Sequence, residues 1–201
     1  MTACVEWGVA TRTLTGQDQS GDRHVVCPYP GGALLAVVDG LGHGDEAAAA
    51  ARVACTILGA RPRASAIALI RECHEALRGT RGAVMSLATF NATDDTMTWL
   101  GVGNVEAVLI RADPNATSPR EAMLLRGGVV GYELPKLRAG VLMLDRGDTL
   151  VLATDGIRGG FAERVSVTAP PKPHADELLD QLAKDSDDAL VLVARYLGGG
   201  G

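Results

Sequence analysis

The chain has 201 residues, of which 47% are apolar and 3% aromatic, and this supplies enough apolar surface for the core of one domain. The net charge of -5 and the scattered basic residues argue against a nucleic-acid partner. No apolar run is long enough to predict a membrane span, and the first fourteen residues do not resemble a secretory signal. We therefore expect one cytoplasmic domain over residues 1–197 and a flexible glycine tail over residues 198–201.

The secondary structure is predicted from short apolar runs and two kinds of periodicity. Ten apolar or β-branched runs bounded by Gly, Pro, Asp or Asn predict strands at 5–14, 24–29, 33–38, 83–92, 96–100, 105–110, 122–125, 141–144, 149–153 and 189–196. Apolar spacing of three and four residues predicts helices at 45–58, 63–77 and 176–184. Residues 113–119 and the proline-rich residues 169–173 are predicted to be surface loops.

The order of these elements indicates the fold class. Two helices form a block between strands, and strands then follow strands, so most strand pairs should be antiparallel. Long apolar strands favour sheets that are covered on both faces. We therefore predict an α+β fold with four layers, an α-β-β-α sandwich of two mainly antiparallel sheets flanked by helices. The four cysteines lie far apart with no C-x-x-C pair, and we expect reduced, mostly buried thiols.

Three aspartates stand at the ends of apolar strands, at Asp39, Asp155 and Asp187. A carboxylate beside a buried strand is costly to desolvate unless a cation or a hydrogen bond compensates it. The sequence has no basic cluster near these turns. Carboxylate and carbonyl oxygens are the ligands that Mg²⁺ and Mn²⁺ prefer, so a divalent metal site is the economical interpretation.

A single Asp-Gly pair is most often only a turn. The sequence Val38-Asp39-Gly40-Leu41-Gly42-His43-Gly44 carries more information, because three glycines within five positions let the backbone pass close to a ligand just before a helix. A plain hairpin has no need of that pattern.

These motifs, taken with Leu-Gly101-Val-Gly103-Asn104, Ala-Thr154-Asp155-Gly156-Ile and Asp187-Asp188, resemble in order and spacing the metal-dependent protein phosphatases of the PPM family, in their SpoIIE-like branch. The resemblance implies two Mn²⁺ or Mg²⁺ ions about 4 Å apart. It implies that Asp39 bridges both ions and that Gly40 lends its carbonyl to the first. Asp155 and Asp187 would bind the second ion, and Asp188 would be an outer hydrogen-bond partner.

The resemblance leaves other assignments open. The family has an early aspartate that holds metal-bound water, and both Asp22 and Asp18 compete for that place, with Asp22 favoured because it directly precedes a strand. His43 is a candidate acid for the departing oxygen, and the two competing interpretations, which the sequence favours, are that it caps the following helix or orients a metal-bound water. Arg12 lies near the family's phosphate-gripping arginine without matching it closely, so the phosphate-binding residue is unknown.

The implied activity is hydrolysis of phosphoserine or phosphothreonine by metal-activated water, without a covalent nucleophile. A free-standing domain of this length most resembles the stressosome phosphatases of the RsbX group, which implies phosphorylated STAS-domain proteins (RsbR-like and RsbS-like) as partners. Three alternatives remain: a phosphatase of another phosphoprotein such as an anti-anti-sigma factor, a catalytically silent docking module, or an enzyme that hydrolyses small phosphate esters.

The remaining motif residues are given structural roles. We interpret Gly101, Gly103 and Asn104 as a hairpin that supports the strands carrying the metal ligands. The other histidines, His24, His74 and His174, are interpreted as structural or solvated.

Overall fold

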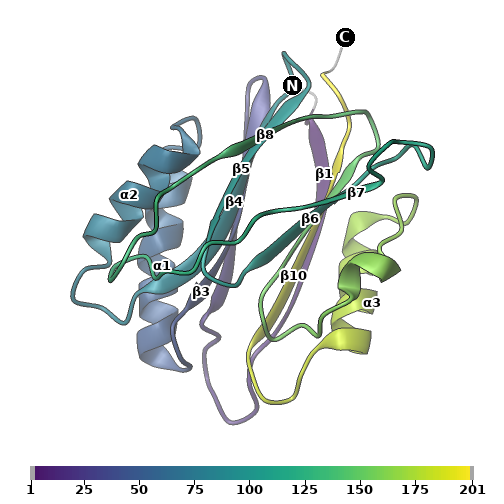
Figure 1. Ribbon diagram of the computed structural model, residues 1–201. Helices are drawn as coiled ribbons and strands as arrows, with labels where there is room; N and C mark the ends of the chain where they lie inside the picture. Colours follow the sequence, from purple (N-terminus) through teal and green to yellow (C-terminus); the bar gives the residue numbers. More distant parts are fainter. Residues whose placement is uncertain (1–2, 200–201) are drawn as a thin grey trace.

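The computed structural model describes residues 3–199 and contains two antiparallel sheets of five strands each, packed face to face (Figure 1). Sheet A has the order β1 (Val5–Arg12), β10 (Ala189–Tyr196), β9 (Thr149–Ala153), β6 (Glu106–Ile110) and β7 (Arg120–Ala122). Sheet B has the order β2 (Asp22–Tyr29), β3 (Gly32–Gly40), β4 (Ala83–Asn91), β5 (Thr96–Val102) and β8 (Gly140–Met143).

Helices cover the outer face of each sheet. The helices α1 (Asp45–Ala60) and α2 (Ala66–Ala76) lie against sheet B, and α3 (Pro171–Leu182) lies against β1 and β10 of sheet A. Figure 1 shows these helices on opposite sides of the paired sheets. A short 3-10 helix, η1 (Phe161–Arg164), precedes α3. The predicted α-β-β-α sandwich is confirmed.

The core consists of three apolar layers that correspond to these contacts. One fills the space between the sheets, one lies between sheet B and the first two helices, and one lies between sheet A and α3. The buried face of α1 is built from alanines with Leu58 at its end, so the helix backbone can approach the sheet closely. Small aliphatic side chains therefore replace the aromatic residues that the sequence lacks.

Three local predictions are wrong. The helix α3 begins at Pro171, not at residue 176, because proline is tolerated in the first turn of a helix, where its missing N–H has no partner. His174 consequently lies in that helix and is buried. Strand β7 covers Arg120–Ala122, three residues that mostly precede the predicted strand. The Gly101–Asn104 segment is not a hairpin, because β5 belongs to sheet B and β6 to sheet A.

Other expectations have mixed outcomes. Residues 113–119 are irregular, as predicted. All four cysteines are free; Cys4 and Cys73 are buried, and Cys27 and Cys55 are partly exposed. Gly200 and Gly201 lie outside the described residues, so the flexible tail stays a prediction, as does the single domain over residues 1–197. Within residues 3–199, none of the helices has both the length and the apolar character needed to cross a membrane.

Candidate metal centre

The predicted carboxylates meet at one end of the sandwich, and the antiparallel register of β2 and β3 brings the first two together. Asp22 opens β2 and is paired directly with Asp39, the second-last residue of β3. Residues directly opposite each other in an antiparallel pair have side chains on the same face. Asp22 is buried, and its Oδ2 accepts a hydrogen bond of 2.7 Å from Oγ1 of Thr154. Since Thr154 follows β9, this bond links the two sheets at the site.

Asp155 reaches the same place from sheet A, one residue after Thr154. Its Oδ2 accepts a 2.7 Å hydrogen bond from Nδ2 of Asn104, and its backbone carbonyl accepts one of 2.5 Å from Nζ of Lys184. The next residue has to be glycine, because a Cβ on Gly156 would lie 1.8 Å from the carbonyl oxygen of Asp188. The Asp-Gly pair therefore serves close packing of two acidic loops as well as presenting the carboxylate.

Asp187 and Asp188 precede β10 and have different surroundings. Asp187 is partly exposed and lines the same pocket as Asp39 and Asp155. Asp188 is buried, and its two carboxylate oxygens each accept a 2.7 Å hydrogen bond, from the backbone N–H groups of Leu14 and Gly21. Asp188 thus fixes the loop between β1 and β2, whereas Asp187 faces the open pocket.

The glycine-rich turn after β3 forms the opposite wall of this pocket. Gly42 and Gly44 have φ angles of 88° and 78°, in the left-handed region that glycine adopts without strain. A Cβ on Gly40 would lie 2.1 Å from the carbonyl oxygen of Ala47, so the turn packs tightly against α1. His43 is exposed and lines the pocket; it does not cap α1, whose N-cap residue is Gly44. The pocket has a volume of about 550 Å³.

The clustered carboxylates raise one another's pKa. Burial, and then the charges of Asp22, Asp155, Asp187 and Asp188, raise the pKa of Asp39 to about 8. Burial also raises the pKa of Asp22 to about 7, against the opposing effect of the hydrogen bond from Thr154. The pKa of Asp187 is raised, chiefly by burial. These groups therefore lie in a strongly negative environment that a bound cation would relieve.

The donor set fits hard divalent cations. Within residues 3–199, no three carboxylate, imidazole or thiol groups lie close enough together to enclose a metal ion by themselves. Mg²⁺ usually keeps several waters and takes only one or two carboxylates from the protein, and Mn²⁺ also suits carboxylate, carbonyl and water oxygens. An open cluster of Asp39, Asp155 and Asp187, with water completing the coordination, satisfies that preference.

Two sequence candidates lie away from this cluster. Asp18 is exposed in the loop before β2 and does not line the pocket. The guanidinium group of Arg12 donates hydrogen bonds of 3.3 Å to Asp185 and to the carbonyl of Leu179. Sequence reasoning overlooked Thr154 as a partner of Asp22, and Lys184 and Ser186 as neighbours of the carboxylates. Of these three residues, only Thr154 could have been found from the sequence, because it stands beside Asp155.

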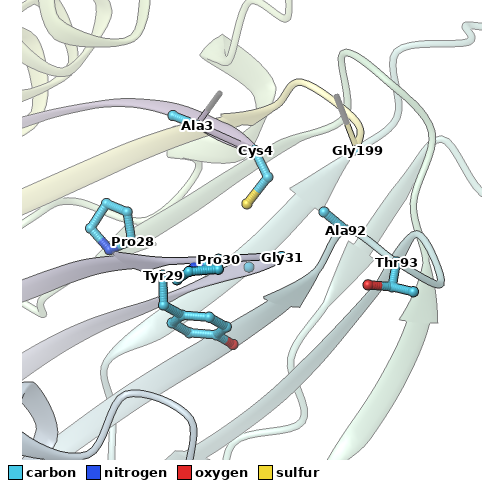
Figure 2. Close-up of a pocket in the computed structure, with 10 residues that line it drawn as sticks. Ala3, Cys4, Pro28, Tyr29, Pro30, Gly31, Ala92, Thr93 and Gly199 are labelled. Carbon is cyan, nitrogen blue, oxygen red and sulfur yellow. The ribbon is translucent and has the colours of Figure 1, made fainter. Parts of the chain in front are cut away.

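A second cleft, of about 530 Å³, lies at the other end of the strands, near the described ends of the chain. Figure 2 shows Cys4, Tyr29 and Ala92 around it. Among residues 3–199, its lining contains no carboxylate side chain and no imidazole. It therefore lacks the ligands of a hard metal ion, and the acidic end of the sandwich is the candidate site.

Comparisons with known proteins bear on this site. The family model described as stage II sporulation protein E (SpoIIE) matches residues 29–197. A bacterial structure described under "The bacterial stressosome: a modular system that has been adapted to control secondary messenger signaling" is 29% identical, with a TM-score of 0.87 over 95% of this chain and 99% of that chain. The comparison with curated proteins finds no match.

Two further structures share the fold. RsbX in complex with magnesium is 18% identical, with a TM-score of 0.85 over 96% of this chain and 95% of that chain. The serine/threonine phosphatase PstP/Ppp of Mycobacterium tuberculosis is 14% identical, with a TM-score of 0.73 over 96% of this chain and 99% of that chain. At these identities the likeness concerns the fold alone.

Proposed function

The chain belongs to the SpoIIE family, within the PPM phosphatases, and we propose that it is a metal-dependent hydrolase of phosphoserine and phosphothreonine in partner proteins. One observation carries the proposal: Asp22, Asp39, Asp155 and Asp187 come from both sheets and gather at one end of the sandwich, where burial and then the neighbouring carboxylates raise the pKa of Asp39 to about 8. A protein has no structural reason to hold so many acids together without a cation, because the arrangement destabilises the fold.

We assign the metal ligands to Asp39, Asp155, Asp187 and the carbonyl of Gly40, with two Mn²⁺ or Mg²⁺ ions as the cofactors. Such ions supply an activated water and stabilise negative charge on the phosphoryl oxygens. Around them, Asn104 fixes the carboxylate of Asp155 through its 2.7 Å hydrogen bond.

We assign Asp22 to orienting a water and His43 to transferring a proton. Thr154 donates to one oxygen of Asp22, which leaves the other oxygen of that carboxylate to accept a hydrogen bond from a water and orient it. His43 is exposed in the pocket wall and is our candidate for donating a proton to the departing serine or threonine oxygen. His43 would be needed most for substrates whose leaving oxygen is a poor leaving group.

The substrate we favour is a phosphorylated STAS-domain protein of a stressosome, of the RsbR-like or RsbS-like kind, whose dephosphorylation resets a stress response in the cytoplasm. The support is the 29% identity to a structure described under the bacterial stressosome, over nearly the full length of both chains. The pocket is open to solvent, with His43 and Ser186 exposed in its wall, so a phosphorylated side chain on a protein can approach it.

Four substrates test this proposal in the presence of Mn²⁺: a phosphorylated STAS-domain protein, a phosphorylated anti-anti-sigma factor, p-nitrophenyl phosphate and a nucleotide. We expect the STAS-domain protein to have the highest kcat/KM. Preference for the anti-anti-sigma factor would replace the substrate and keep the chemistry. Preference for the nucleotide would contradict protein phosphatase activity, and no turnover of any substrate would favour a silent docking module.

A further inference from the structure

Within the part of the chain that the structure describes, strand β2 is an edge of sheet B and pairs with β3 alone. The backbone N–H of Asp22 donates to Oγ of Ser20 at 3.0 Å, and Sγ of Cys55 lies 4.0 Å from the carbonyl of His24, so these backbone groups point away from β3. Since the direction of backbone groups alternates along an antiparallel strand, those of Val26 point the same way. Pro28 has no N–H and ends this free edge.

A groove of about 750 Å³ runs along this edge. One wall is strand β2 from Asp22 to Cys27, and the other is the exposed side of α1, with Arg52, Cys55 and Thr56. Asp22 also belongs to the carboxylate cluster, since its charge raises the pKa of Asp39. The groove therefore begins beside the candidate metal centre and leads away from it along the free edge.

The charge of the groove is opposite in sign to that of the metal centre. Arg23 and Arg52 both line it, and neither guanidinium group lies within 4.0 Å of a carboxylate in the part of the chain that the structure describes. Nε of Arg23 is buried without any hydrogen-bond partner there. Arg52 donates only to the side-chain oxygen of Gln19, at 2.5 Å.

Nine of the sixteen arginines have no carboxylate within salt-bridge distance in residues 3–199, and Arg23 and Arg52 are the two of these that line the groove. Seven other arginines pair with a carboxylate, namely Arg12, Arg61, Arg78, Arg81, Arg111, Arg120 and Arg195. A buried donor without an acceptor costs about 1–3 kcal/mol, and an anionic ligand would satisfy it. Free backbone groups on an edge strand are, in addition, a template for an extended polypeptide.

We propose that this groove binds an extended acidic segment of the phosphoprotein substrate, which adds as a strand to β2 and places its carboxylates on Arg23 and Arg52. The inference rests on the proposed function, because the segment belongs to the protein that is dephosphorylated. The N–H of His24 and the N–H and carbonyl of Val26 supply the backbone hydrogen bonds, since the carbonyl of His24 already accepts one from Sγ of Cys55. The two arginines supply the preference for acidic sequence. The groove thus selects among phosphoproteins, whereas the metal centre acts on the phosphate itself.

Charge reversal at Arg52 tests the proposal, with Arg71→Glu as the control. Arg71 is also an exposed helical arginine with no carboxylate within salt-bridge distance in the described residues, and it lies on α2, outside the groove. The readout is the ratio of kcat/KM for a phosphorylated STAS-domain protein to kcat/KM for p-nitrophenyl phosphate. We expect Arg52→Glu to lower this ratio about tenfold and Arg71→Glu to leave it at the wild-type value.

Hydrogen exchange provides a second readout that does not depend on a groove variant. In the variant Asp39→Asn, whose phosphate release we expect to be lost, saturation with the phosphorylated STAS-domain protein should slow amide exchange at His24 and Val26. An unchanged ratio in Arg52→Glu, or unprotected amides, would overturn the groove while metal-dependent turnover by the wild type keeps the proposed function. Failure of the wild type to turn over the phosphoprotein would remove both.

Discussion

Replacing Asp39 by asparagine should stabilise the metal-free protein, although it removes a proposed ligand. The pKa of Asp39 rises from 3.8 to about 8 on folding, and an acid whose pKa is raised by folding binds its proton more tightly in the folded state. Its ionisation therefore favours unfolding. The contribution of Asp39 to the free energy of unfolding is highest at and below about pH 4 and is lost as the pH rises towards 8. Asparagine has nearly the same shape and cannot ionise.

The magnitude follows from the pKa shift. About four pKa units correspond to roughly 6 kcal/mol at about 1.4 kcal/mol per unit. Asp39 is partly exposed, and the four neighbouring carboxylates can themselves take up protons and so reduce the repulsion. The substitution should therefore raise the free energy of unfolding by only a part of that value, on the order of 2 kcal/mol. For a domain of this size that gain raises Tm by roughly 4–8 °C.

The assay is thermal unfolding in the presence of a chelator at pH 5 and pH 8, with Asp18→Asn as the control, because Asp18 is exposed and lies outside the cluster. We expect the gain in Asp39→Asn to be several degrees at pH 8 and clearly smaller at pH 5, and Asp18→Asn to match the wild type. An equal gain at both pH values, or a loss of stability at pH 8, would refute the electrostatic reasoning.

Three further substitutions test other parts of the site. Asp155→Ala should keep the fold, judged by circular dichroism, and lower kcat about 100-fold or more; near-wild-type turnover would remove Asp155 from the site. Asn104→Ala should weaken Mn²⁺ binding, measured by calorimetry, about tenfold through loss of its bond to Asp155, and unchanged affinity would contradict that support. Gly156→Ala should lower the free energy of unfolding by about 3 kcal/mol, because its Cβ would meet the carbonyl of Asp188, and an unchanged denaturant midpoint would disprove the clash.

The sequence predicted the layers of the fold because the apolar runs are long and their order is simple. It also predicted which acids would converge, since Asp39, Asp155 and Asp187 each stand beside a buried strand. It favoured Asp22 over Asp18 only because Asp22 directly precedes a strand, whereas the proximity of Asp22 to Asp39 depends on the register of β2 against β3.

Other features of the site depend on contacts between distant residues. The bond between Thr154 and Asp22 joins positions 132 residues apart, and the bond from Asn104 to Asp155 joins positions 51 residues apart. Neither contact has a local pattern. The start of α3 was misjudged for the opposite reason, since the local signal of three prolines indicates a loop unless one of them occupies the first helical turn.

Phosphate release from a phosphorylated STAS-domain protein, followed with Mn²⁺ present, then with a chelator, and then with Mn²⁺ restored, tests the central claim most directly. The account predicts release that stops with the chelator, returns with the metal and is absent from Asp39→Asn under every condition. Release that persists in the chelator, or an Asp39→Asn variant that releases phosphate at the wild-type rate, would contradict a metal centre built on Asp39.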